Sequence, residues 1–174
     1  MGKEKLNVYA VHGPFKVPTV PNLKLLDQER LGSVFWDTVQ NQDKRMLDKR
    51  PGCYVFVMRA GKGYTAYYIG QATKNFRQEC FSLDKQLKYQ CALAMSGKGT
   101  PMLFLVAYPH KQGARNKKEI GEIESFLIQQ LGPRLNKQGI RPPTWGIEGV
   151  IRGGKGNLSR GAKQFRRLFR LNGI

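Results

Sequence analysis

A carboxylate stands on the apolar face of a predicted helix in the last third of the chain. Between residues 120 and 131 apolar side chains recur at the three- and four-residue spacing of one helix face, and Glu124 falls on that face. The apolar members are Ile120, Ile123, Leu127, Ile128 and Leu131. Burying a lone carboxylate among them costs on the order of several kcal/mol. Glu124 is therefore predicted either to bind a divalent metal ion or to form a structural ion pair with Lys or Arg.

The chain is strongly basic. It has 174 residues, with 30 Lys and Arg against 12 Asp and Glu, for a formal net charge of +18. Such a field favours polyanions, so nucleic acid is the first partner class to consider, ahead of anionic lipid. No stretch approaches the roughly 18 apolar residues of a membrane-spanning helix, and no secretion signal is visible. We expect a cytoplasmic protein without a membrane partner or an evident small-molecule substrate.

Neither the cysteines nor the histidines form a metal-binding pattern. Cys53, Cys80 and Cys91 fit neither a disulfide framework nor a zinc spacing. We expect all three to be reduced core residues. His12 and His110 are isolated in turn-rich segments and are predicted to be structural or exposed.

The flanks of the chain differ from its middle. Residues 1–50 are predicted to form a proline-containing arm with at most one short strand, followed by a helix from Ser33, as N-cap, to about Leu47. Residues 138–174 are a basic extension in which Ser159 can cap a short helix with a narrow apolar stripe. We expect that stripe to dock on the domain.

The middle segment, residues 51–137, alternates strands and helices. Residues 52–58 and 64–69 are predicted to form a hairpin, and residues 101–108 a buried strand. A helix is predicted from Thr73 to about Gly97, followed after a basic loop by the Glu124 helix, which ends at Gly132. The packed face of the first helix would contain Phe76, Cys80, Leu83, Leu87, Cys91 and Ala94. This order predicts an α/β (α+β) sandwich with a small three-stranded mixed or antiparallel sheet flanked by helices.

Two tripeptides in the hairpin belong to a longer pattern. Gly52-Cys53-Tyr54 and Tyr68-Ile69-Gly70 are followed by Arg77, Glu124 and Asn136. Over residues 51–137 this order resembles the GIY-YIG nuclease family, with Cys53 at a position that is usually aliphatic. The resemblance implies a GIY-YIG-like fold and a metal-dependent endonuclease that hydrolyses phosphodiester bonds in DNA.

The resemblance also implies roles for five residues. Tyr54 would take part in activating the attacking water with support from Tyr68, and Arg77 would contact the scissile phosphate. Glu124 would hold Mg²⁺ or Mn²⁺, and Asn136 would brace the site. One carboxylate suits Mg²⁺, which takes one or two protein oxygens. Because tyrosine has a pKa of about 10, we expect basic neighbours or the metal ion to lower the pKa of Tyr54.

These roles require the two tyrosines to face the same side of the sheet. An even loop over residues 60–63 would place Tyr54 opposite Ile69, with the rings on opposite faces. We therefore expect a bulged turn at the glycines of this loop, with Tyr54 directly across from Tyr68.

Basic side chains outside the motifs are predicted to bind the nucleic-acid backbone: Lys74, Arg115, Lys117, Lys118, Arg160, Lys163, Arg166, Arg167 and Arg170. An alternative is a catalytically impaired nucleic-acid-binding protein on the same fold. Two departures from the family pattern motivate it: Phe81 stands where many members carry a polar residue, and Arg77 follows Gly70 at a shorter spacing than is common. A basic RNA-associated structural protein would leave Glu124 unexplained. The sequence leaves specificity, oligomeric state and biological role open.

Overall fold

The computed structural model describes residues 7–109, 116–137, 149–153 and 165. Five strands form one sheet in the order β3-β2-β4-β1-β5. In chain order they are β1 (Asn7–Lys16), β2 (Gly52–Ala60), β3 (Gly63–Ala72), β4 (Thr100–Ala107) and β5 (Gly149–Gly153). The first four strands in that order pair antiparallel, and β5 pairs parallel with β1. The fold is therefore α+β, with β3 at one edge.

The predicted three-strand count is wrong because both flanks add a strand to the sheet. The N-terminal arm pairs with β4 as β1, and Pro14 lies where the register shifts between His12 and Phe15. A proline is tolerated there because the ladder is already interrupted. Strand β5, beyond the Glu124 helix, pairs with β1 in turn. Long-range pairing of this kind leaves no local signal in the sequence.

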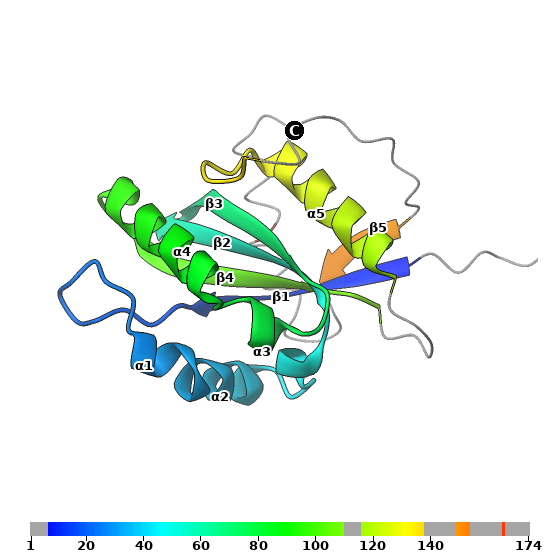
Figure 1. Ribbon diagram of the computed structural model, residues 1–174, viewed down its shortest axis with the longest axis horizontal. Coiled ribbons are helices and arrows are strands. Elements are labelled where there is room, and N and C mark those ends of the chain that lie inside the picture. Colours follow the sequence, from blue (N-terminus) through cyan, green and yellow to red (C-terminus); the bar gives the residue numbers. More distant parts are fainter. Residues whose placement is uncertain (1–6, 110–115, 138–148, 154–164, 166–174) are drawn as a thin grey trace, which may run out of the picture.

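Helices cover both faces of the sheet (Figure 1). One face carries α1 (Gln28–Leu31), α2 (Ser33–Gln42), the 3₁₀ helix η1 (Leu47–Lys49), α3 (Phe76–Glu79) and α4 (Leu83–Ser96), and the other carries α5 (Lys117–Leu131). Strand β2 divides its side chains between the two layers with the period of two expected of a buried strand. Tyr54 and Phe56 pack in the α4 layer, and Cys53 and Val55 in the α5 layer.

The helix predicted from residue 73 to 97 is two helices, and its packed face is wrong. Helix α3 ends at Cys80, and Ser82 begins α4 as a new N-cap. This break resets the phase of the second helix, whose buried residues are Tyr89, Ala92 and Leu93. Those predicted to be buried there, Leu83, Leu87, Cys91 and Ala94, are exposed. Tyr89 fixes the new phase by stacking on Phe56 with ring centroids 4.2 Å apart.

Cys91 is thus an exposed thiol, which corrects its prediction as a core residue. Cys53 and Cys80 are buried and free, as predicted. Helix α2 is shorter than predicted because it ends at the C-cap Asp43, before Leu47, and its N-cap is Gly32, so the prediction of Ser33 as N-cap is wrong. Asp43 instead accepts a 2.5 Å hydrogen bond from the fully buried His12, so the structural prediction for this histidine is confirmed.

The predicted terminal helix from Ser159 and His110 lie outside the described residues, apart from Phe165. Phe165 is buried against Phe104 in the α5 layer, with ring centroids 5.3 Å apart. In the described ranges, no helix has both the length and the apolar character needed to cross a membrane.

Candidate functional site

The outer edge of β3 is covered by polar groups from α5 and the turn that follows it. The Asn136 side chain bonds Ile69 twice, accepting from its N–H at 2.9 Å and donating to its carbonyl at 2.7 Å. The Leu135 N–H donates to the Tyr67 carbonyl at 2.9 Å. The Gln71 N–H faces the Glu124 carboxylate and favours its ionised form. Asn136 and Glu124 therefore meet alternate residues of one edge strand, whose backbone groups would otherwise be unpaired.

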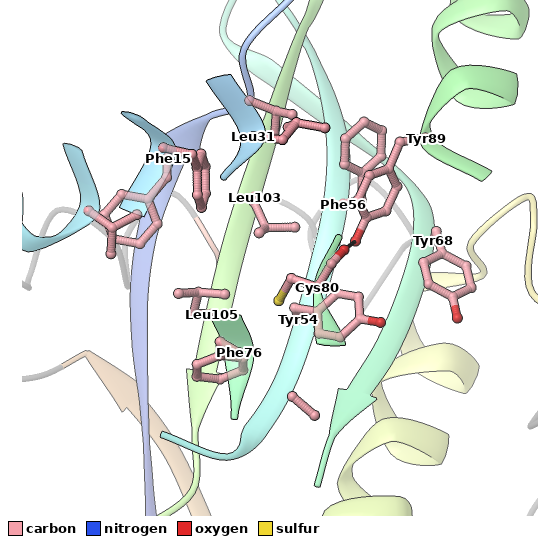
Figure 2. Close-up of a cluster of buried hydrophobic side chains, with 14 of the residues drawn as sticks. Phe15, Leu31, Tyr54, Phe56, Tyr68, Phe76, Cys80, Tyr89, Leu103 and Leu105 are labelled. Carbon is pink, nitrogen blue, oxygen red and sulfur yellow. Dashed lines mark hydrogen bonds between the residues drawn. The ribbon is translucent and has the colours of Figure 1, made fainter. Parts of the chain in front are cut away.

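The hairpin places the two motif tyrosines on one face, as predicted, but not opposite each other. Tyr54 pairs with Gly70, and Phe56 pairs with Tyr68. The register shifts between Phe56 and Val57, within the strands rather than at the turn. The Tyr54 and Tyr68 ring centroids are 6.2 Å apart, and both rings lie in the α4 layer (Figure 2). The expected bulge exists, but its extra residue is Tyr67 of β3, so Tyr54 falls opposite Gly70 and the predicted pairing with Tyr68 is wrong.

Gly70 is required by the Tyr54 ring that lies over it. A Cβ at position 70 would stand 2.4 Å from the Tyr54 hydroxyl oxygen and 2.5 Å from Cζ. Neither contact can relax by rotating a flexible chain end, because the ring is fully buried. The glycine therefore lets the Tyr54 hydroxyl lie against the backbone of the edge strand.

We predict that Gly70→Ala destabilises the fold by about 1–3 kcal/mol or more, the range for overpacking a core. When combined with Gly70→Ala, Tyr54→Phe should not restore stability, because Cζ also clashes with the new Cβ. Tyr54→Leu in the same background should restore part of the lost stability. Gly121→Ala in α5 is the matched control: its Cβ would find only the Gln71 Oε1 at 3.6 Å, and alanine favours a helix by about 1 kcal/mol. Urea unfolding gives the free energy of unfolding of each of the four variants. Equal stability of Gly70→Ala and wild type would contradict the packing described.

The Tyr54 hydroxyl is buried without a hydrogen-bond partner among the described residues. Desolvation raises the pKa of Tyr54, and the charges of Tyr89, Cys80, Tyr68 and Glu124 add to this effect. The expectation that basic neighbours lower this pKa is therefore wrong for the protein without ligands. Burial and these electrostatic effects act in the same direction, so Tyr54 keeps its proton. An orphaned buried hydroxyl is rare in native structures, and water or a ligand commonly satisfies one.

Glu124 is half-buried where α5 crosses the β3 edge. Desolvation raises the pKa of its carboxyl to about 7, against the opposing effects of Lys85, the Gln71 N–H and Lys88. Within the described part of the chain, Glu124 forms no ion pair at contact distance. The structural ion pair weighed as an alternative is thus not seen there.

The donor chemistry at Glu124 fits a hard divalent cation. A desolvated carboxylate gains from an adjacent cation, and Mg²⁺ accepts a single protein oxygen with water or substrate oxygens as its other ligands. In the described residues no cluster of three or more His, Cys, Asp or Glu side chains could hold a metal ion. Among the described carboxylates, Glu124 is thus the one we expect to hold a metal ion at this edge, with water or substrate oxygens among the other ligands.

Arg77 and Phe81 do not join this cluster. The Arg77 guanidinium nitrogen Nη1 lies 3.5 Å from the buried Asp48 Oδ2 of η1. Phe81 packs into the aromatic core, with its ring centroid 4.9 Å from that of Phe35. The structure thus brings together four of the five motif residues, Tyr54, Tyr68, Glu124 and Asn136, and places Arg77 in an ion pair of its own.

Two lysines of α4 lie at the Tyr68 ring of the site, although they were not among the predicted site residues. Lys85 and Lys88 place their Nζ atoms 5.5 Å and 4.3 Å from the Tyr68 ring centroid. Their three-residue spacing shows that they share a helix face. The break at Ser82 determines which residues of α4 face the sheet, and the periodicity of the segment did not predict this break.

The other predicted nucleic-acid-binding residues fall into two groups. Lys117 and Lys118 are exposed in the first turn of α5, and Lys74 is exposed just before α3. The remaining six, Arg115, Arg160, Lys163, Arg166, Arg167 and Arg170, lie outside the described residues.

Comparison of the chain with protein-family models, curated proteins and solved structures finds no match.

Proposed function

We propose that the protein is a metal-dependent endonuclease that hydrolyses DNA phosphodiester bonds at the β3 edge, on a GIY-YIG-like fold. One observation carries the proposal: the Tyr54 hydroxyl, which has no hydrogen-bond partner among the described residues, lies against Gly70 of the same edge strand whose Gln71 N–H meets the Glu124 carboxylate. A water molecule or a phosphate oxygen would accept a hydrogen bond from the Tyr54 hydroxyl, and a divalent cation would bind the Glu124 carboxylate. The net charge of +18 supports a polyanionic substrate.

Each residue has a defined task in the proposed reaction. The oxygen of a water molecule bonds to phosphorus and releases a proton to the solvent, while the bond from phosphorus to a sugar oxygen breaks and that oxygen takes up a proton from the solvent. Tyr54 keeps its proton, so its hydroxyl orients the water or a phosphate oxygen and does not serve as the base. Asn136 fixes the edge strand through Ile69. Glu124 would hold Mg²⁺ or Mn²⁺, which when bound would supply positive charge for the negative charge that develops in the transition state.

The alternative is a nucleic-acid-binding protein without cleavage activity on the same fold. The ion pair of Arg77 with Asp48 and the core position of Phe81 favour it, because both remove polar groups that the family resemblance would place at the site. Lys85 and Lys88 offset this loss by bringing two cations to the Tyr68 ring.

Incubation of the protein with supercoiled plasmid DNA and a matched structured RNA tests the proposal. We expect nicked and linear DNA in Mg²⁺ or Mn²⁺, none in EDTA, and slower or no cleavage of the RNA. Gel-shift binding of the same DNA in Ca²⁺ separates the two functions. Binding without cleavage in any divalent metal would favour the alternative.

A further inference from the structure

The Tyr68 ring fixes the position of two positive charges. The Lys88 Nζ is 4.3 Å from its centroid, and the Lys85 Nζ is 5.5 Å away. Tyr68 is only 5% exposed, so the core holds the ring itself in place. A cation over a tyrosine face is attracted by the ring's electrons, which favours lysine side-chain conformations in this region.

The same lysines act on Glu124 from the opposite side of the sheet. Their positive charges favour the ionised form of its carboxyl group. Helix α4 packs in one layer and α5 in the other (Figure 1), so the lysines and Glu124 belong to opposite faces of the sheet. Tyr54 and Tyr68 also lie in the α4 layer. The two lysines thus act electrostatically on the proposed metal ligand and lie over the Tyr68 ring, whose centroid is 6.2 Å from that of Tyr54.

These lysines share a single carboxylate among their described ion pairs. The Asp84 Oδ2 is 2.7 Å from the Lys85 Nζ and 4.0 Å from the Lys88 Nζ. Because the Asp84 side chain is 60% exposed, these ion pairs are screened by solvent and contribute little to stability. An incoming anion can displace Asp84 at little cost and meet an excess of positive charge.

Arg77, in contrast, forms an ion pair within the folded structure. Its partner Asp48 has a side chain that is 3% exposed, and the second carboxylate oxygen, Oδ1, has no hydrogen-bond partner among the described residues. Moving the guanidinium to a substrate would leave a buried carboxylate without its cation, which is strongly unfavourable.

We propose that Lys85 and Lys88 form a phosphodiester-binding subsite beside Glu124, in the role that the family resemblance gives to Arg77. The ligand class is the monoanionic phosphodiester of a nucleic-acid backbone, and its identity rests on the proposed function. The lysines bind the phosphate from the α4 layer, and the Tyr68 ring positions them.

Single-turnover cleavage of a labelled duplex in Mg²⁺, at saturating full-length protein, tests the subsite. Lys85→Gln/Lys88→Gln should cut about 100-fold more slowly, whereas Lys85→Arg/Lys88→Arg should retain most of the rate. Lys24→Gln/Lys98→Gln removes the same charge from exposed positions and should cut within about twofold of wild type. Arg77→Gln should lose stability, yet its folded fraction should cut within about threefold. A Lys85→Gln/Lys88→Gln protein that cuts like the Lys24/Lys98 control would overturn the subsite.

A metal-free titration with the dinucleotide thymidylyl-thymidine tests the subsite independently of cleavage. At low salt we expect saturable NMR shifts of the Tyr68 ring and the Lys88 side chain, lost in Lys85→Gln/Lys88→Gln and kept in Lys24→Gln/Lys98→Gln. If wild type shows these shifts but cuts no DNA, the subsite stands and the nuclease proposal fails. If wild type cuts DNA but the shifts are absent or survive the Lys85/Lys88 change, the subsite fails alone.

Discussion

Glu124→Gln is expected to stabilise the folded protein at alkaline pH. The carboxyl pKa is raised from 4.5 to about 7 on folding, so the folded state binds the proton more tightly than the unfolded state. Ionised Glu124 therefore reduces stability progressively as pH rises from about 4.5 to 7, by on the order of 1–3 kcal/mol once fully ionised. Gln has no charge to desolvate. Urea unfolding should show the variant more stable than wild type at pH 8 and similar to it at pH 5.

Two controls connect this result to metal binding. Glu122→Gln, on the same helix, should not reproduce the pH-dependent gain. Millimolar Mg²⁺ should raise the melting temperature of wild type at pH 8, because a cation bound only by the folded state stabilises it. Mg²⁺ should not change the melting temperature of Glu124→Gln. A stability difference that is the same at pH 5 and pH 8 would contradict the burial of a titrating carboxyl group.

Tyr54→Phe is expected to separate catalysis from stability. The Tyr54 hydroxyl has no hydrogen-bond partner among the described residues, so its removal breaks no bond and relieves a desolvated polar group. Stability should stay within about 0.5 kcal/mol of wild type or rise. Cleavage at saturating protein should fall at least 100-fold, the lower end for loss of one oriented hydrogen-bonding group.

Tyr89→Phe is the crossed control, because its hydroxyl donates to the Cys80 carbonyl at 2.8 Å. This variant should lose about 1 kcal/mol of stability and retain cleavage in its folded fraction. Single-turnover rates and urea unfolding of both variants give the comparison. Full cleavage activity in Tyr54→Phe would show that the tyrosine is a packing residue.

Local patterns predicted the elements around the site well. The spacing of aliphatic residues correctly gave the buried face of α5, beside which Glu124 is half-buried. The parity of the hairpin correctly required a bulge for the Tyr54 and Tyr68 rings to share a face. The sequence did not indicate where the bulge lies, because either strand can take the extra residue. It also could not predict that β1 and β5 join the sheet, since their partners are distant in the chain.

The cationic part of the site was mispredicted for a similar reason. Arg77 matches the family pattern locally, but its partner Asp48 lies in η1 and is recognised only in the folded protein. Lys85 and Lys88 were missed because a helix drawn continuously from residue 73 has the wrong phase after Ser82. The lowered pKa expected for Tyr54 neglected desolvation, whose strength depends on burial under α4 and cannot be judged from nearby positive charges.

The most direct test of the nuclease site is single-turnover cleavage of a labelled DNA duplex by wild type, Glu124→Gln and Tyr54→Phe purified in parallel. The site described here predicts Mg²⁺-dependent strand scission by wild type, a loss of at least 100-fold in each variant, and DNA affinity in Ca²⁺ within about threefold for all three. Cleavage by Glu124→Gln at the wild-type rate, with the variant folded and bound to DNA, would contradict it.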